Sequence, residues 1–372
     1  MKILYVGMKY SYYGSSTSRV GLSFEHYNFY DSLMKMNRGE HRVIYFPYDE
    51  VMREIGKEAM NQRLLDVVAK EKPDLCFFIL YTEEFYPETI QKITEKSGTI
   101  TFNWFADDHW RFDGYSRYWA PLFRWVGTTD SLAVEKYHKI GFKNVIKTQW
   151  ACNHFLYKSQ TNQRLDSDSP KKYNYDVSFI GQPHGDRKQI VQRVREAGID
   201  IQCFGSGWPN GRINQEKMIK IFSVSKINLN LTKSSSAWTL YGIGHLFLKR
   251  VGTIPLINFP MVLPQKPKDV LSNIKIFLIS QREQIKGRNF EIPGCGGFLL
   301  TGDADNLRDY YQDGKEIVIF TDTDDLINKI KYYFTHNKER EKIAQAGYQR
   351  TLRDHTYEKR FSEIFKVIGL KD

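Results

Sequence analysis

Short apolar runs and helical stretches alternate through the first half of the chain. Strand-like runs occupy residues 2–7, 41–47, 74–81, 99–106, 125–129 and 144–150, and helical patterns occupy 58–71 and 130–140. Most of these runs are continuously apolar, which is typical of strands that are covered by helices on both sheet faces. The repetition of strand, helix and strand predicts a parallel sheet with right-handed crossovers.

The alternation of strand-like runs and helical patterns resumes after a polar stretch. Residues 158–175 contain almost no apolar side chains and predict a linker or an exposed loop. Strand-like runs follow at 176–181, 200–205, 227–231, 297–301 and 316–320, and helical patterns at 186–198, 324–335, 338–353 and 357–367. The pattern predicts an α/β protein with two Rossmann-like domains that face each other across a cleft.

The length of 372 residues also favours two domains over a single core. We expect domains over residues 1–157 and 176–355, with a linker over 158–175 between them. The helix of residues 356–372 is expected to pack back on the first domain. Residues 236–280 are apolar and rich in proline, and they fit either an insertion packed on the second domain or a lobe that contacts an acceptor or a membrane.

The net positive charge of the chain favours anionic partners but does not identify one. Lys and Arg outnumber Asp and Glu by 54 to 43, which gives a net charge of +11. Such a surplus fits phosphorylated small molecules, acidic glycans, membrane surfaces or nucleic acid. The four cysteines are far apart and form no C-x-x-C pair, so neither a disulfide framework nor a zinc site is predicted. No apolar stretch is long enough for a spanning helix, and we expect a cytoplasmic protein, with attachment to the inner face of the membrane left open.

A cluster of carboxylates, cations and glycines surrounds the start of the run at 297–301. Its members are Glu283, Lys286, Arg288, Glu291, Gly296 and Gly297. Carboxylates accept hydrogen bonds from vicinal hydroxyls, cations donate to a diphosphate, and glycines let backbone amides approach it. These groups predict a nucleotide-sugar site. The alternative for Glu291 is that it offsets the dipole of a helix in its first turn.

A second anion site is predicted after the run at 176–181. The sequence SFIGQPHGDRKQ passes from a strand through a glycine loop into a helix, with Gly181, Arg187 and Lys188 at the turn. Free amides and the positive dipole end of a helix favour phosphate there. The alternative is an ordinary turn with solvated basic residues.

Two loops of the first domain are expected to face the cleft. Asp107, Asp108 and His109 follow the run at 99–106, and mutual repulsion between the two carboxylates would raise one pKa and suit a general base. The alternative is that one aspartate caps a helix. The loop after the first strand supplies a polar lip for an acceptor or phosphate, made of Gly14, Ser15, Ser16 and Arg19.

Several segments resemble one family. IKGRNFEIPGCGGFLLT, KEIVIF and AQAGYQRTLRDHTYEKRFSEIF resemble the C-terminal signature of CgeB-like, spore-maturation-type glycosyltransferases, and the resemblance covers most of 176–367. FNWFADDHWRF and WACNHFLY extend it into the first half. The resemblance implies a GT-B fold with an acceptor domain over 1–157 and a donor-binding domain over 176–355.

The resemblance also implies roles for particular residues. In related GT-B families an E-x7-E pair contacts the donor sugar and the ribose, and its two glutamates fall on Glu283 and Glu291. Arg187 and Lys188 fall near the donor diphosphate. The implied enzyme is a metal-independent hexosyltransferase without a cofactor. It would move a sugar from a UDP-, GDP- or dTDP-linked donor to a protein, a glycan or a lipid-linked acceptor of the cell surface.

Two other classes of function remain as alternatives. A non-catalytic protein that binds nucleotide sugars could use the same fold, because a fold does not prove turnover. A nucleic-acid-binding protein would explain the positive charge, but no RNP-like, zinc or helix-turn-helix signature is present, and no nucleic acid partner is expected. A dehydrogenase is disfavoured because the first strand is not followed by G-x-G-x-x-G.

Overall fold

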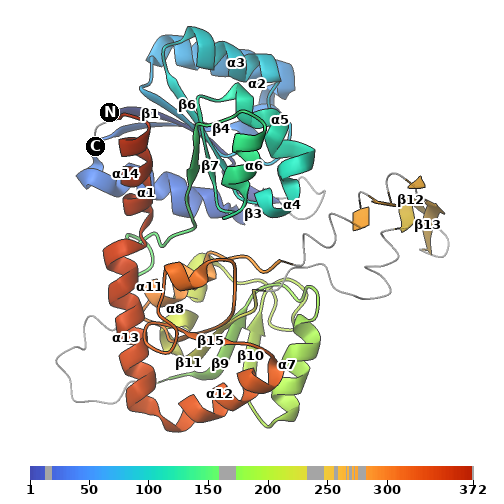
Figure 1. Cartoon of the computed structure of the whole chain (residues 1–372), viewed down its shortest axis with the longest axis vertical. Helices are drawn as coiled ribbons and strands as arrows, with labels where there is room; N and C mark the ends of the chain where they lie inside the picture. Colours follow the sequence, from blue (N-terminus) through green and yellow to red (C-terminus); the bar gives the residue numbers. More distant parts are fainter. Residues whose placement is uncertain are drawn as a thin grey trace.

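The protein contains two parallel sheets, which lie one above the other in Figure 1. The computed structural model describes residues 1–12, 19–158, 173–232, 247–254, 259–264, 266–267, 270–271, 273–274 and 282–370. No helix in this described part of the chain is both long and apolar enough to cross a membrane.

The first domain is a six-stranded parallel sheet with helices on both faces. Its strands are β1 (Lys2–Gly7), β4 (Arg42–Pro47), β5 (Leu75–Phe78), β6 (Ile100–Phe105), β7 (Trp125–Thr128) and β8 (Val145–Lys147), and the hairpin β2 (Tyr10–Tyr12) and β3 (Arg19–Leu22) follows β1. The order in the sheet is β4-β1-β5-β6-β7-β8. The helices are α1 (Asp31–Lys35), α2 (Tyr48–Glu71), α3 (Pro87–Lys96), α4 (Asp108–Arg111), α5 (Arg117–Trp119) and α6 (Ala133–Lys139), with short π or 3-10 helices at His26–Tyr30, Met36–Gly39, Phe112–Ser116 and Ala120–Leu122.

The second domain repeats this plan with five strands. These are β9 (Tyr175–Ile180), β10 (Ile201–Phe204), β11 (Ser225–Asn230), β14 (Leu299–Gly302) and β15 (Val318–Phe320), in the parallel order β10-β9-β11-β14-β15. The helices are α7 (Arg187–Glu196), α8 (Gln215–Val224), α11 (Arg288–Gly294), α12 (Thr323–Thr335) and α13 (Asn337–Asp354), with a 3-10 turn at Leu307–Asp309. An antiparallel hairpin of β12 (Leu248–Ile254) and β13 (Phe259–Pro264) lies to the side of this domain (Figure 1).

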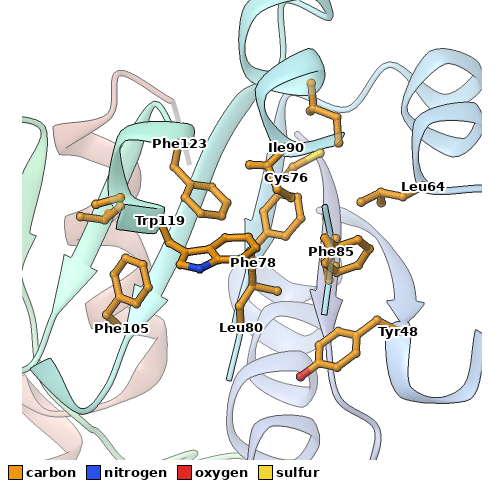
Figure 2. Close-up of a cluster of buried hydrophobic side chains, with 14 of the residues drawn as sticks. Tyr48, Leu64, Cys76, Phe78, Leu80, Phe85, Ile90, Phe105, Trp119 and Phe123 are labelled. Carbon is orange, nitrogen blue, oxygen red and sulfur yellow. The ribbon is translucent and has the colours of Figure 1, made fainter. Parts of the chain in front are cut away.

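Successive residues of a strand point to opposite faces of the sheet, so they pack into the hydrophobic cores on its two sides. Leu4 and Val6 of β1 pack in the core under α2 and α3, together with Phe78 of β5 (Figure 2). Ile3 and Tyr5 face the opposite core. The continuous apolar runs in the sequence therefore reflect strands that are buried on both faces.

The chain crosses between the domains twice, and the two crossings pair with each other. The amide of Cys152 donates to the carbonyl of His355 at 2.9 Å, and the amide of Tyr357 donates to the carbonyl of Cys152 at 3.0 Å. Helix α14 (Tyr357–Val367) then packs on the first domain, where Phe361 and Phe365 are fully buried beside Phe77. The last helix is thus part of the first core although it follows the second domain in sequence.

The predicted α/β class with two Rossmann-like sheets is confirmed, while several elements differ from the predictions. Helix α2 is interrupted at Gly56, whose φ of 82° is not helical, so the predicted helix of 58–71 corresponds to the part after this break and the part that begins at Tyr48 was not predicted. The β2–β3 hairpin and helices α3 and α8 were not predicted. The interpretation of residues 236–280 falls largely outside the described residues.

Candidate functional site

A cavity of about 320 Å³ lies between the two domains, at the carboxyl ends of their first strands. Ile180 and Gly181, at the end of β9, line it from one side, and Phe24, Tyr27 and Asn28, in the segment after the β2–β3 hairpin, line it from the other. Its volume is in the range of ~300–1,000 Å³ that small-molecule sites occupy. Open α/β sheets bind ligands at this edge, so the cavity is a candidate ligand site.

Glu291, whose carboxylate is fully buried, is one of the residues that line this cavity. Helix α11 places Glu291 one turn after Arg288, and the two side chains form an ion pair. Tyr157 donates its hydroxyl to Glu291 Oε1 at 2.7 Å, and Gln215 donates to the Tyr157 hydroxyl. Burial and the adjacent carboxylate raise the pKa of Tyr157. Burial alone would lower the pKa of Arg288, but Glu291 raises it above the ordinary value, so the guanidinium stays charged.

Two cations lie next to this cavity. Burial and then the nearby Arg187 guanidinium lower the pKa of Lys286, while the Asp107 carboxylate opposes the change. Arg187, at the start of α7, donates to the carbonyls of Gln182 at 3.0 Å and Leu231 at 2.8 Å, and burial lowers its pKa. Lys188 is exposed. Two positive charges that lie close together and are partly buried repel each other, and a bound anion would offset this repulsion.

The two aspartates predicted to face the cleft, Asp107 and Asp108, lie in different environments. Asp107 lies at the edge of the cleft: burial raises its pKa, and the charges of Lys286 and Arg111 oppose the rise. Asp108 is fully buried inside the first domain, where the Tyr137 hydroxyl of α6 donates to its Oδ2 at 2.9 Å. This placement corrects the expectation that both carboxylates face the cleft. Helix α4 begins at Asp108, so the Asp108 side chain points in a different direction from that of Asp107 and enters the core of the first domain.

His109 is the third residue predicted for this loop. It is buried, and burial, followed by the charges of Lys286 and Arg282, lowers its pKa to about 3. The imidazole is therefore neutral at physiological pH. It lies near the interdomain charges, but it is a weak base there.

The two predicted glycines are not among the residues that line the cavity. Gly296 and Gly297 end helix α11, and a Cβ on Gly297 would lie 2.7 Å from Asn228 Nδ2 and from the Phe222 carbonyl oxygen. The amides of Gly296 and Gly297 donate to the carbonyls of Pro293 at 2.8 Å and Ile292 at 3.0 Å, so they are not free to cradle a diphosphate, and this corrects the prediction.

Glu283 and Arg19, two further predicted site residues, have contacts within their own domains. Glu283 is half-buried, and its carbonyl accepts a hydrogen bond from the Asp305 amide at 3.0 Å. Arg19 pairs with Glu50 at 2.8 Å within the first domain. Gly14, Ser15 and Ser16 lie outside the described residues.

Sequence reasoning missed two residues that line the cavity, Tyr157 and Gln215, and one that does not, Glu25. Tyr157 lies in the quoted segment WACNHFLY, but nothing in that segment shows that its hydroxyl meets a carboxylate 134 residues away. Gln215 begins a helix that was not predicted. Glu25 is a buried carboxylate next to Phe24, and its only sequence signal is an acidic residue in an aromatic segment.

Comparisons with known proteins agree with this architecture. Residues 261–366 match a family model described as glycosyl transferase-like. The spore protein CgeB of Bacillus subtilis strain 168 is 21% identical over 231 residues, which are 62% of this chain and 63% of CgeB. The chain thus spans somewhat less than two thirds of the length of this relative. These matches confirm the CgeB-like resemblance, and the E-x7-E pair stays a prediction.

Solved structures show the fold. HepE of Anabaena, in complex with UDP-glucose, has a TM-score of 0.56 at 10% identity, with 99% of each chain covered. A glycosyltransferase from Rickettsia africae has a TM-score of 0.56 at 9% identity, with 99% of this chain and 98% of the other covered. Sucrose-phosphate synthase from Thermosynechococcus elongatus has a TM-score of 0.53 at 11% identity, with coverage of 90% and 82%. The chain has the GT-B fold, as predicted.

Proposed function

We propose that the protein is a glycosyltransferase that moves a sugar from a nucleoside diphosphate donor to an acceptor held by the first domain. The observation that carries the proposal is the interdomain cavity, which the Glu291–Arg288 pair lines and which Arg187 approaches through its hydrogen bond to the lining residue Gln182. The glycosyl transferase-like family match and the UDP-glucose bound to HepE support it. The support from HepE is an analogy at the level of the fold.

In this proposal Glu291 holds the ribose. Each carboxylate oxygen has two lone-pair sites, and Tyr157 and Arg288 each occupy one. One further site on each oxygen is sufficient to accept both hydroxyls of a vicinal diol. Arg288 pairs with the carboxylate and Tyr157 donates to it, so the acceptor atoms are ordered before the ligand arrives.

The diphosphate takes the place between Lys286 and Arg187. Both side chains have lowered pKa values because they are buried, and an anion between them would relieve that cost. The same cations would stabilise the leaving diphosphate during transfer, when its negative charge increases.

Asp107 serves the acceptor side. In transfer with inversion, the acceptor oxygen bonds to the anomeric carbon while the bond from that carbon to the diphosphate oxygen breaks. The electron pair leaves with the diphosphate, and the acceptor proton passes to Asp107. Burial raises the pKa of this carboxylate, which makes it a stronger base than an ordinary aspartate.

Ligand-dependent melting tests the nucleotide part of this proposal. We expect UDP, GDP or dTDP at one hundred times its dissociation constant to stabilise the protein by about 2.7 kcal/mol. Lys286→Met should weaken binding of that nucleoside diphosphate by roughly 2–4 kcal/mol and leave binding of the bare nucleoside unchanged. Lys220→Met, at an exposed position of α8, is the matched control.

The results separate three cases. If none of the nucleotides shifts the melting temperature, the proposal is wrong. If a nucleotide binds but the corresponding nucleotide sugar is neither hydrolysed nor transferred, the protein is a binding protein on the same fold. Turnover that depends on Lys286 and not on Lys220 supports the transferase.

A further inference from the structure

Loops after three neighbouring strands meet at the carboxyl edge of the first sheet. Tyr81 follows β5 by three residues, Asp107 follows β6 by two, and Glu25 lies in the segment that returns after β1 and its hairpin. The strands β1, β5 and β6 are adjacent in the sheet. The Tyr81 hydroxyl donates to Glu25 Oε1, and the charge of Asp107 acts on Tyr81. The three side chains therefore form one cluster at the edge that faces the second domain.

Two aromatic rings in this cluster are open to solvent. Tyr81 is 40% exposed and Trp110 is 42% exposed, whereas Tyr115 and Trp119, in the next turns of the same segment, are buried. Trp110 lies one turn after Asp107, and its backbone amide donates to the Asp107 carbonyl at 3.1 Å. An exposed tryptophan and an exposed tyrosine thus flank a carboxylate, on the side of the cleft opposite Lys286.

This combination matches the surface of a sugar. A pyranose ring presents an apolar face of C–H groups and a rim of hydroxyls. Aromatic rings bury the apolar face, and a carboxylate accepts hydrogen bonds from the hydroxyls. A lipid chain would favour a continuous apolar surface, but Asp107 and Arg111 interrupt this one.

We propose that Tyr81, Trp110 and Asp107 form an acceptor subsite for a carbohydrate. The inference rests on the proposed function and specifies its acceptor as a sugar. Tyr81 and Trp110 hold the acceptor ring, and Asp107 accepts a hydrogen bond from the hydroxyl that receives the transferred sugar. Glu25 is a positioning residue, because it is buried and its hydrogen bond fixes the Tyr81 ring.

Saturation-transfer NMR tests the acceptor class directly. Four probes are added to the protein with its nucleoside diphosphate bound: maltotriose, chitotriose, a peptide with serine and threonine, and a polyprenyl phosphate in detergent. We expect saturation to pass to ring C–H groups of at least one oligosaccharide. If no oligosaccharide receives saturation, or if only the peptide or the polyprenyl phosphate binds, the proposal is overturned.

Variants then locate the binding. Trp110→Ala and Tyr81→Ala should each weaken oligosaccharide binding by about tenfold, because a stacking surface is lost. Trp110→Phe keeps a flat ring and should retain most of the affinity, whereas Tyr81→Phe keeps the ring but loses the hydrogen bond to Glu25, and its affinity should lie between wild type and Tyr81→Ala. Tyr332→Ala removes a tyrosine of α12 that is 44% exposed, and it is the matched control. Wild-type affinity in both alanine variants would overturn the site.

Nucleotide binding keeps this test independent of the proposed function. The thermal shift with nucleoside diphosphate should be unchanged in all five variants, since none of the substituted residues lines the cavity. A protein that binds no nucleotide would contradict the proposed function. A protein that binds nucleotide normally but no oligosaccharide would contradict only the acceptor subsite.

Discussion

Asp107 and Asp108 are neighbours in sequence and have different environments. The charge of Lys286 reaches Asp107 from the second domain, whereas Asp108 accepts a hydrogen bond from Tyr137 inside the first domain. Burial raises the pKa of Asp108 to about 6, although the nearby hydroxyls of Ser116, Thr128 and Tyr137 oppose the rise. The structure thus leaves Asp107 as the candidate base and gives Asp108 a structural role.

This division predicts different effects of the two asparagine variants on turnover. Asp107→Asn should lower turnover by roughly two to four decades and leave nucleotide affinity unchanged. Asp108→Asn should keep turnover within a few-fold of wild type, because the amide can still accept the hydrogen bond from Tyr137. Steady-state kinetics and nucleotide titration of both variants measure this. Equal losses of turnover in both would show that the loop works as a unit.

The pKa of Asp108 also predicts a pH dependence of stability. The folded pKa of about 6 lies above the ordinary 3.8, so the folded state holds the proton more tightly than the unfolded chain. The resulting stability is complete below pH 3.8 and is lost as pH rises to about 6. Asp108→Asn should remove this loss, which is on the order of 3 kcal/mol. Urea unfolding at pH 4 and pH 7 should show the variant gaining stability relative to wild type at the higher pH.

At the scale of elements, α11 is positioned by its contact with α13. A Cβ on Gly347 of α13 would lie 2.2 Å from the carbonyl oxygen of Glu316 and 3.6 Å from Pro293 of α11. A Cβ on Gly294 would lie 2.2 Å from the Cys152 sulfur, at the crossing between the domains. The absence of side chains at these glycines lets α13, α11 and the crossing lie close together, and α11 carries Arg288 and Glu291 into the cavity.

Gly347→Ala tests this dependence. A helix-interior glycine ordinarily stabilises a protein when it is replaced by alanine, but here the new methyl group would meet backbone. We expect a loss of about 1–3 kcal/mol in unfolding free energy, because α13 must move away from the Glu316 carbonyl, and weaker nucleotide binding, because that movement disturbs its packing on α11. Gln349→Ala, at an exposed position of the same helix, should stay within ~0.5 kcal/mol of wild type. A stabilised Gly347→Ala variant would contradict the close packing.

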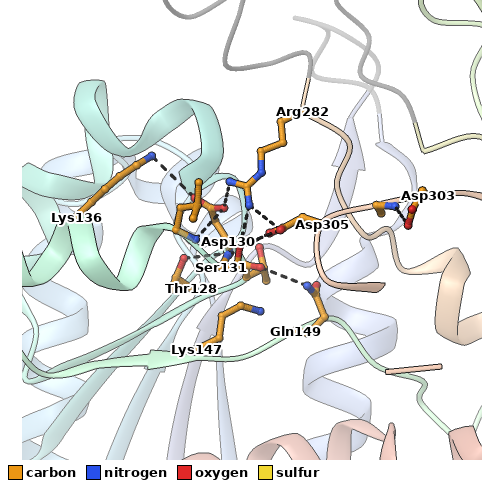
Figure 3. A network of polar contacts seen from close by, with 12 residues as sticks. Thr128, Asp130, Ser131, Lys136, Lys147, Gln149, Arg282, Asp303 and Asp305 are labelled. Carbon is orange, nitrogen blue, oxygen red and sulfur yellow. Dashed lines mark hydrogen bonds and ion pairs between the residues drawn. The ribbon is translucent and has the colours of Figure 1, made fainter. Parts of the chain in front are cut away.

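At the scale of the whole molecule, a polar clamp joins the domains. Arg282 of the second domain pairs with Asp130 of the first domain at 2.6 Å and with Asp305 of its own domain at 2.6 Å (Figure 3). Ser131 donates its hydroxyl to Asp305 at 2.9 Å. Asp130 is fully buried, so the clamp is more than a surface contact. It holds the segment that leads from Arg282 to Lys286 against the first domain.

Arg282→Ala should open the cleft. Removal of the guanidinium leaves the buried Asp130 carboxylate with the Leu132 amide at 3.4 Å and Lys136 at 3.9 Å, and loss of one partner of a buried pair costs about 3–5 kcal/mol. We expect a larger radius of gyration in small-angle scattering and weaker nucleotide binding. Arg308→Ala breaks a pair with Asp303 in which the arginine side chain is 52% exposed, and it should change neither quantity. Unchanged scattering in Arg282→Ala would show that the clamp does not hold the domains closed.

The order of apolar and polar residues determined the two parallel sheets. Continuous apolar runs predicted β1, β5, β9 and most other strands within a few residues, because a strand buried on both faces has few polar positions. The same reasoning missed β2 and β3, whose residues are partly exposed, and α8, which leads into β11 with no loop between them. The cluster around Glu291 was recognisable because its charges and glycines are close together in the chain.

Only the tertiary structure decided which of the polar residues meet. Whether Asp107 or Asp108 faces the cleft depends on the residue at which α4 begins, because consecutive residues at a helix start point in different directions. The contacts of Glu291 with Tyr157, of Glu25 with Tyr81 and of Arg282 with Asp130 join residues from 56 to 152 positions apart. Local patterns carry no information about such contacts, because they depend on the order of strands in each sheet and on how the two domains face each other.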